Sequence, residues 1–310
     1  MALGTDHVTK TTADKFIPEV WSDEIVAAYK QNLVAANLFS KMSFKGKKGD
    51  TLHIPKPTRG SASAKAASTQ VTLIAATESE VQVLINKHYE YSRLIEDIVE
   101  TQALSSLRRF YTDDAGYALA KQVDTDLIQL GRTAGTGTAY SSAASSTNAW
   151  IGSTGATAYN SSTSNAAALG DAGIRRSIQR LDDADVPMTD RFLIIPPTTR
   201  NTLMGLARFT EQAFTGEVSG GNTIRNGQVG DVYGVKVYVS TNADTAAGNS
   251  ATDRICLLAH KDAFVLAEQM GVRSQAQYKQ EYLGTLFTSD MLYGVAELRD
   301  GSAVALAVPA

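Results

Sequence analysis

The feature that most constrains this fold is a long proline-free stretch with helical apolar spacing between Tyr91 and Leu130. Its apolar side chains recur in steps of four and finally three residues, a spacing typical of one apolar helix face: Leu107, Tyr111, Ala115, Leu119, Val123, Leu127 and Leu130. Helices of globular proteins average about 11 to 12 residues, whereas a helix of about forty residues would span roughly 60 Å. We therefore predict a spine helix, packed on a sheet, in a protein that belongs to an assembly. A coiled coil fits less well, because no heptad with flanking charge pairs persists.

The polar residues of the same stretch predict a second face in contact with water. This face carries Arg108, Asp113, Asp114, Lys121, Gln122, Asp124 and Asp126. The stretch begins with an acidic group, formed by Glu90, Glu96, Asp97 and Glu100.

Length and charge narrow the class of protein. A chain of 310 residues can bury a large core in one domain or two, and we favour two intertwined domains. Its 29 basic and 32 acidic residues leave a net charge of -3, which argues against a surface built to neutralise nucleic-acid phosphates along its length. The sequence has no run of 18 apolar residues and no secretion signal, so we expect a soluble protein made in the cytosol, without membrane contact.

The N-terminal part reads as an arm followed by an extended loop. Residues 1–15 lack apolar periodicity, and a short amphipathic helix is expected from about Pro18 to Leu33. From Lys45 to about Leu84, glycines and prolines separate the strand-like pieces 51–54, 71–74 and 81–85. The loop is locally basic through Lys45, Lys47, Lys48, Lys56 and Arg59. Two interpretations stay open: a solvated charge run, or an arm that lies on acidic patches of a neighbour.

The rest of the chain reads as α/β material with one low-complexity segment. In residues 131–165, 30 of 35 positions are Gly, Ala, Ser, Thr or Asn, which predicts a surface excursion that Trp150 and Ile151 anchor to a core. The elements expected after it are a helix over 174–181, a strand over 192–195, a helix around Leu203, a flexible loop over 216–230, strands over 235–239 and 255–259, a helix-like segment over 262–269, and a hairpin that joins 295–298 to 304–308 through Asp300 and Gly301.

The search for chemistry predicts no catalytic, cofactor-binding or metal-binding residues. Phosphate-binding loops, dinucleotide fingerprints, paired CxxC motifs and nucleophile elbows are all missing, and His7, His53, His88 and His260 are scattered singly. Asp182, Asp183 and Asp185 could hold a hard cation, although a helix end in water explains them better. Cys256 lies in an apolar run, which predicts a buried strand residue and no nucleophile.

The order of these pieces resembles the major capsid proteins of tailed bacteriophages, which have the HK-type capsid shell fold. The resemblance rests on Phe16-Ile17-Pro18-Glu19-Val20-Trp21, Gly49-Asp50-Thr51-Leu52-His53-Ile54-Pro55, Leu181-Asp182 to Val186-Pro187, Arg191-Phe192-Leu193-Ile194-Ile195-Pro196-Pro197, Asp231-Val232-Tyr233-Gly234-Val235-Lys236-Val237 and Tyr293-Gly294-Val295. Each motif is unspecific alone, but their order runs over nearly the whole chain.

The resemblance implies an α+β fold with five regions. Residues 1–45 would be the N-terminal arm and first helix, 46–88 the extended β-hairpin loop, and 89–130 the peripheral domain with the spine helix. Residues 131–255 would be the axial α/β domain with its surface insert at 131–165, and 256–310 the C-terminal strands that complete the sheets.

The same resemblance implies a structural protein without catalysis. It would assemble in the host bacterial cytoplasm into hexamers and pentamers of an icosahedral virion shell around double-stranded DNA, with a scaffolding protein, a portal and decoration proteins as partners. Some members crosslink a loop lysine to an asparagine. Lys56 and Lys65 lie in the right region, but no motif fixes the asparagine, so we predict no crosslink.

One contact follows from charge alone. We expect the basic loop (Lys45, Lys47, Lys48, Lys56, Arg59) to dock on the acidic group (Glu90, Glu96, Asp97, Glu100) of an adjacent subunit. Charge reversal at Lys47 and Lys48 should then impair assembly and leave solubility intact. The alternatives are an encapsulin-like bacterial compartment protein, which would enclose enzymes, an α/β hydrolase that uses Asp183, Asp185 and His260, and a surface-array protein.

Overall fold

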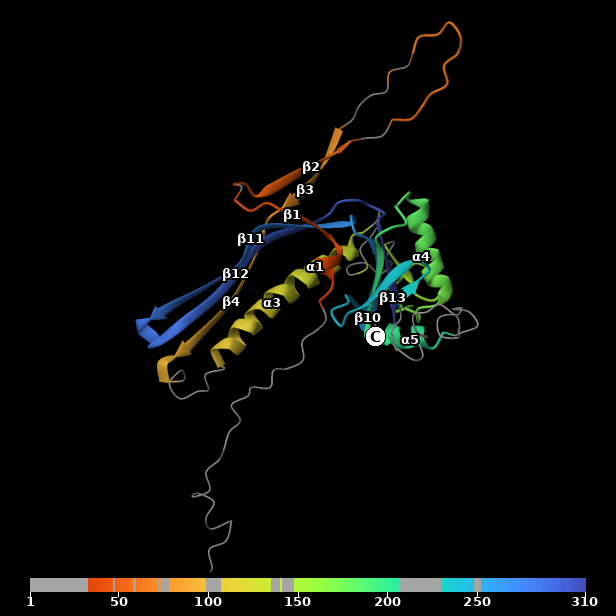
Figure 1. Ribbon diagram of the computed structural model, residues 1–310. Helices are drawn as coiled ribbons and strands as arrows, with labels where there is room; N and C mark the ends of the chain where they lie inside the picture. Colours follow the sequence, from red (N-terminus) through yellow and green to blue (C-terminus); the bar gives the residue numbers. More distant parts are fainter. Residues whose placement is uncertain are drawn as a thin grey trace, which may run out of the picture.

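The computed structural model describes residues 33–46, 48–57, 60–71, 73, 78–98, 107–134, 140, 148–206, 230–247 and 252–310. These residues form a four-stranded sheet, a larger sheet of seven strands and a separate two-stranded hairpin (Figure 1). The expected short helix before Leu33 and most of the loop over 216–230 lie outside the described residues. The fold is the mixed α+β arrangement expected from the sequence.

The seven-stranded sheet, called the axial sheet below, is buried on both faces. Its strands follow the order β5 (Ala149–Ile151), β13 (Ala303–Val308), β10 (Thr252–His260), β6 (Arg191–Ile195), β8 (Val235–Val239) and β7 (Asp231–Val232), with β9 (Thr245–Ala247) paired to β10. Helices α4 (Asp171–Asp183) and α5 (Pro197–Met204) pack their apolar residues against one face. All five residues of β6 are buried, which explains the continuous apolar run in its sequence.

The four-stranded sheet, called the peripheral sheet below, is long and narrow. Its order is β1 (Ser40–Ser43), β11 (Phe264–Lys279), β12 (Gly284–Glu297) and β4 (Lys87–Glu96), with η3 (Gln280–Tyr282) at the turn between β11 and β12. The spine helix α3 (Leu107–Gln129) runs along one face and continues into η2 (Leu130–Arg132). Residues such as Met291 and Tyr293 of β12 and Leu127 of α3 share one core.

The hairpin of β2 (Thr51–Pro57) and β3 (Glu78–Leu84) extends away from both sheets, as Figure 1 shows. Its root packs on the peripheral sheet, where Val83 contacts Val265 and Ala267. Gly294 is required at this crossing, because a Cβ there would lie 2.3 Å from the carbonyl oxygen of Leu84. The strand pieces expected over 51–54 and 81–85 are confirmed.

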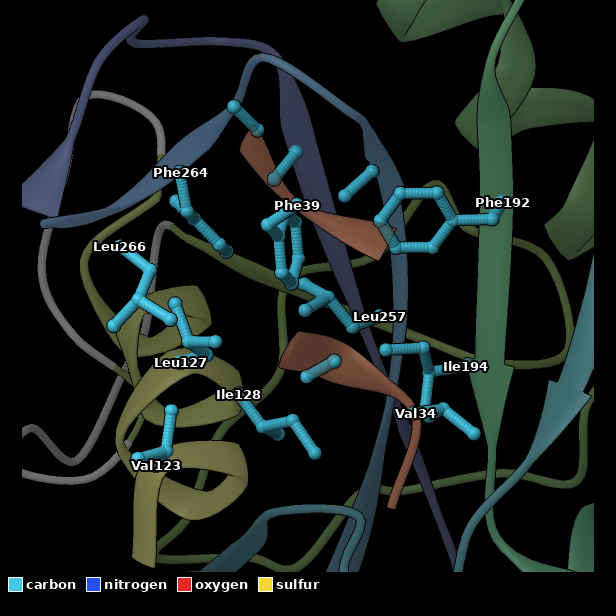
Figure 2. Close-up of a cluster of buried hydrophobic side chains, with 14 of the residues drawn as sticks. Val34, Phe39, Val123, Leu127, Ile128, Phe192, Ile194, Leu257, Phe264 and Leu266 are labelled. Atoms are coloured by element: carbon cyan, nitrogen blue, oxygen red, sulfur yellow. The ribbon is translucent and has the colours of Figure 1, made fainter. Parts of the chain in front are cut away.

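A short N-terminal segment lies between the two sheets. It contains α1 (Ala35–Leu38) and Phe39, whose ring centroid is 5.0 Å from that of Phe192 on β6 and 4.9 Å from that of Phe264 on β11. Figure 2 shows these side chains meeting in one cluster with Leu127 of the spine helix. The two sheets therefore share a single continuous core.

The predicted start of the spine helix was wrong. Residues Lys87–Glu96 form strand β4, in which Tyr91 lies opposite Ser289 of β12. A step of four residues keeps side chains on one face of a strand as well as of a helix, so the spacing before Leu107 did not separate the two. From α3 onward the apolar face is confirmed, with Ala115, Leu119, Val123 and Leu127 buried.

The prediction that the second face of this helix is in contact with water was also wrong in part. Asp113 is exposed, but Asp124 is 0% exposed and Asp126 is 6% exposed. The last turns of α3 are covered on several sides, by the peripheral sheet and by the N-terminal segment, so the helix has little solvent-facing surface there.

Two further predictions fail in the last quarter of the chain. Residues 264–269 belong to strand β11 and form no helix, because the run from Phe264 to Ala267 is buried on both faces of a sheet. The stretches 295–298 and 304–308 do not form a hairpin. The first belongs mostly to β12 of the peripheral sheet, whereas Ala303–Val308 pair with β10 of the axial sheet. Gly301 adopts a φ of 80° between them, so the turn residue was right and the pairing was not.

Five elements expected in the second half are confirmed. The helix over 174–181, the helix around Leu203 and the strands over 192–195, 235–239 and 255–259 are α4, α5, β6, β8 and β10. Trp150 and Ile151 attach the low-complexity segment to the core through β5, which pairs in parallel with β13. The guanidinium of Arg180 stacks on the Trp150 ring at 3.4 Å.

Candidate functional site: two exposed charged surfaces

The described basic residues lie at and beyond the root of the hairpin. Lys48 and Lys56 are exposed, and Lys45 is exposed but forms an ion pair with Glu268 of its own chain at 3.5 Å. Lys47 and Arg59 lie outside the described residues. We call Lys45, Lys48 and Lys56 the basic hairpin surface. Two of its three members, Lys48 and Lys56, form no ion pair among the described residues.

The described acidic residues lie along β4, the edge strand of the peripheral sheet. Glu90 and Glu96 are exposed on this strand, and Asp97 follows it directly and accepts a hydrogen bond of 2.7 Å from the Tyr278 hydroxyl. Glu100 lies outside the described residues. We call Glu90, Glu96 and Asp97 the acidic strand surface.

A row of charged side chains crosses the strands next to Glu90. Arg273 of β11 donates two hydrogen bonds to Asp290 of β12, at 3.0 and 2.7 Å, and His88 of β4 lies 3.2 Å from the same carboxylate. The hydrogen bonds from Arg273 lower the pKa of Asp290, and His88 adds to this effect. Arg273 thus pairs with Asp290, and Glu90 forms no ion pair among the described residues.

The two surfaces lie on elements that extend in different directions within one chain. In Figure 1 the hairpin leaves the body on one side, whereas β4 runs beside β12 toward the opposite end of the molecule. Among the described residues, no ion pair joins Lys48 or Lys56 to Glu90 or Glu96. Four members of these surfaces, Lys48, Lys56, Glu90 and Glu96, are thus exposed and form no ion pair with one another in the described part of the chain.

Large apolar side chains are exposed at the ends of the same two elements. Val71 and Leu73 lie in the hairpin loop. Leu94, Ile98, Tyr278, Tyr282 and Leu283 lie at the far end of the peripheral sheet. Exposed apolar groups gathered at projecting ends are typical of surfaces that become buried in an assembly.

The candidate chemical residues are not brought together. Asp182 forms an ion pair with Arg191 at 2.7 Å, and Nδ1 of His260 accepts a hydrogen bond from the backbone of Asp262. No hydrogen bond or ion pair in the described part of the chain joins His260 to Asp183 or Asp185. Burial raises the pKa of the Cys256 thiol to about 12, so it is not a nucleophile at neutral pH.

The described residues include no candidate metal site and no candidate membrane-spanning helix. No group of three or more His, Cys, Asp or Glu side chains among them is arranged to hold a metal ion. No helix in the described part has the length and apolar content that a bilayer-spanning segment needs.

Sequence reasoning missed the buried carboxylates of the spine helix. Asp126 accepts hydrogen bonds from the Tyr293 hydroxyl at 2.6 Å and from Gln122, and it forms an ion pair with Lys87 at 3.1 Å. Asp124 binds the N-terminal segment and is described below. The sequence contained a signal for their burial, because Asp124 directly follows Val123 and Asp126 directly precedes Leu127, two residues of the apolar stripe.

Comparison with known proteins decides the family. The family model described as "Phage capsid protein" matches residues 93–303. The chain belongs to this phage capsid protein family. It is thus a structural protein of a phage virion, the major component of a self-assembling shell.

Solved structures show the same fold for this capsid protein. A chain of "Mycobacterium phage Che8" has 23% sequence identity and a TM-score of 0.75, with 94% of this chain and 97% of that chain covered. A chain from "Capsid structure of the Cyanophage P-SCSP1u" has 19% identity and a TM-score of 0.75, with coverages of 99% and 96%. For "Cyanophage Pam1 capsid asymmetric unit" the identity is 13%, the TM-score 0.73 and both coverages 99%. No curated protein sequence matches the chain.

Proposed function

We propose that this capsid protein assembles as hexamers and pentamers of an icosahedral head that encloses double-stranded DNA. The basic hairpin surface of one subunit docks on the acidic strand surface of its neighbour. The observation that supports this proposal is the exposure of two surfaces that are opposite in charge and belong to elements extending in different directions in one chain. A head-to-tail contact of this kind closes into rings when the rotation between subunits permits it.

The energetics favour many weak contacts over a few strong ones. An exposed ion pair contributes about 0.2 to 1 kcal/mol and weakens with salt. Burial of the exposed apolar groups, such as Leu73 at 90% and Leu94 at 40% exposure, adds a contribution that salt does not screen. We therefore expect high salt to slow assembly without dissolving finished shells.

The remaining partners follow from the same role. The arm (1–45), extended loop (46–88), peripheral domain (89–130), axial domain (131–255) and C-terminal strands (256–310) would act as one unit, made and assembled in the host cytoplasm. We propose that assembly uses a scaffolding protein and a portal, and that decoration proteins bind the finished shell. The net charge of -3 suits a shell that encloses DNA without binding it tightly. The role requires no catalysis.

The docking contact is tested by charge reversal and its compensation. The double variant Lys48→Glu/Lys56→Glu should stay soluble but form few shells in negative-stain electron microscopy. Adding Glu90→Lys/Glu96→Lys should restore them. Lys236→Glu reverses an exposed lysine of β8 and serves as the matched control. Normal shells from the Lys48→Glu/Lys56→Glu variant would contradict the proposed docking contact.

The contents of the shell test the rest of the proposal. Particles produced with the neighbouring phage genes should contain double-stranded DNA, measured as nuclease-resistant nucleic acid after purification. Shells filled with a protein cargo would instead favour an encapsulin-like compartment. A monodisperse monomer under every condition would contradict assembly itself.

A further inference from the structure

One buried carboxylate contributes hydrogen bonds to the connection between the two sheets. Asp124 lies in the spine helix α3 and is 0% exposed. Its Oδ1 atom accepts hydrogen bonds from the backbone N–H groups of Val34 at 3.0 Å and Ala35 at 2.7 Å. Its Oδ2 atom accepts a hydrogen bond of 2.9 Å from the side-chain amide of Asn242.

These three partners belong to different parts of the molecule. Val34 and Ala35 lead into the N-terminal segment between the sheets, and Asn242 lies in the loop between β8 and β9 of the axial sheet. The spine helix itself packs on the peripheral sheet. Asp124 therefore joins the helix of one sheet to a loop of the other, with the N-terminal segment as the third member.

A second pair of contacts holds the same loop farther along the helix. Arg132, at the end of η2, donates two hydrogen bonds of 2.7 Å to Asp244, and the buried Tyr140 hydroxyl donates a third of 2.7 Å. Asn242 also exchanges hydrogen bonds with the Thr125 side chain, at 3.0 and 3.2 Å. Residues 240–244 thus contact the spine helix and its continuation at two positions, Asp124 and Arg132. These positions are roughly 12 Å apart along the helix axis at ~1.5 Å per residue.

The energetics of Asp124 point to positioning as its main role. A buried carboxylate that binds only neutral donors loses its hydration, and apolar residues of similar volume are often as stabilising as buried charges. An apolar residue, however, cannot form the three directional hydrogen bonds that Asp124 accepts. Because each oxygen accepts from a defined donor, Asp124 admits only a narrow range of positions for the loop and the N-terminal segment.

We propose that Asp124 is a positioning residue that fixes the angle between the peripheral and axial sheets and thereby sets the curvature of the shell. The part concerning curvature rests on the proposed function. The 23-residue spine helix acts as a lever. About 25 Å of it lie between Asp124 and its far end at Leu107, so a rotation of about 5° at Asp124 displaces that end by about 2 Å. A displacement of this size separates side chains that were in contact with a neighbour, and subunits then meet at variable angles.

The test uses variants that change the hydrogen-bond pattern around Asp124. Asn242→Ala removes the axial contact at a half-buried position and leaves the other Asp124 bonds in place. Asp124→Asn places two amide donors against each other. The exchange Asp124→Asn/Asn242→Asp restores a donor opposite an acceptor. Asp114→Asn is the matched control, because Asp114 lies on the same helix but accepts only from the Tyr91 hydroxyl of the peripheral sheet among its described hydrogen bonds.

Shell diameter, measured by electron microscopy, is the readout that a merely structural role would not move. We expect a several-fold rise in aberrant particles for Asn242→Ala and Asp124→Asn, and recovery of uniform shells in the exchange variant. Uniform shells from Asn242→Ala, a similar defect in Asp114→Asn, or no recovery in the exchange variant would overturn the proposal. The urea midpoint of each unassembled variant separates these results from a general loss of stability.

A measurement on the unassembled subunit keeps this proposal separate from the proposed function. Spin labels at Lys236→Cys in the axial sheet and Gln275→Cys in the peripheral sheet report the distance between the sheets, while the native Cys256 is buried and does not react. The distance distribution should be narrow in the parent and broader in Asn242→Ala. Equal distributions would overturn the role of Asp124 even if shells form, whereas a parent that forms no shells would contradict the proposed function alone.

Discussion

Replacement of Phe39 by alanine should remove a large part of the stability of the subunit. The Phe39 ring is 3% exposed and contacts both Phe192 and Phe264, one from each sheet. Truncation of a buried phenylalanine costs about 3 to 5 kcal/mol, and each aromatic pair adds about 0.5 to 1.5 kcal/mol beyond burial. We therefore expect the upper part of this range, about 4 to 5 kcal/mol, against a total of about 5 to 15 kcal/mol for a native protein.

Equilibrium urea unfolding of the unassembled subunit measures this loss. Phe39→Leu keeps most of the apolar volume and loses the ring contacts, so it should cost about 1 to 1.5 kcal/mol. Phe110→Ala is the matched control, because this half-buried ring of the spine helix contacts only Tyr111 among the described aromatic pairs and should cost about 1 kcal/mol. The reasoning is refuted if Phe39→Ala costs no more than Phe110→Ala with an unchanged dependence on urea concentration, since Phe39 would then not hold the sheets together.

Three further predictions concern single positions elsewhere in the fold. Gly294→Ala should displace the root of the hairpin and lower the melting temperature, because its Cβ would meet the Leu84 carbonyl oxygen. Gly116→Ala, in open space on α3, should raise the melting temperature slightly. Equal effects of the two variants would contradict the close crossing at Gly294. Burial raises the pKa of the Cys256 thiol to about 12 in the folded state, against 9.0 in the unfolded chain. Its contribution to the free energy of unfolding, about 4 kcal/mol, is therefore fully present below pH 9 and is lost as the pH rises toward 12. The urea midpoint of Cys256→Ala should fall less steeply over this pH range than that of the parent. Arg191→Lys should cost about 1 to 3 kcal/mol in urea unfolding, because lysine cannot replace the guanidinium bonds to Val186, Pro187 and Asp182, and a neutral result would contradict this role.

The elements that the sequence predicted well are those with a single dominant pattern. The stripe from Ala115 to Leu127 belongs to a proline-free run that is longer than most strands, and its steps of four residues place every apolar side chain on the same buried helix face. The run Phe192 to Ile195 is bounded by Pro196 and Pro197, which exclude its continuation as a helix or central strand. The basic and acidic groups were located by charge alone, since solvation keeps unpaired charges at the surface.

The elements that could not be predicted depend on partners far away in the sequence. Strand β4 is a strand because β12 pairs with it, some two hundred residues later, and Tyr91 and Ile95 alone fit either structure. The strand β13 leaves its sequential neighbour β12 for β10, because only there are both of its faces covered. Asp124 reads as a solvent-facing residue until the N-terminal segment and Asn242 are known to meet it.

The order of the strands in the peripheral sheet has a consequence for the timing of folding. Strand β1 pairs in parallel with β11, so the hydrogen bonds of Ser40 in this sheet can form only after Val265 has been synthesised. At about 5 to 20 residues per second on the ribosome, the wait is roughly 10 to 45 seconds. Strand β13 crosses the axial sheet within the last ten residues of the chain. A subunit that stops before Ala303 therefore has an axial sheet in which β5 and β10 lack the strand between them, although all four strands of the peripheral sheet are already present.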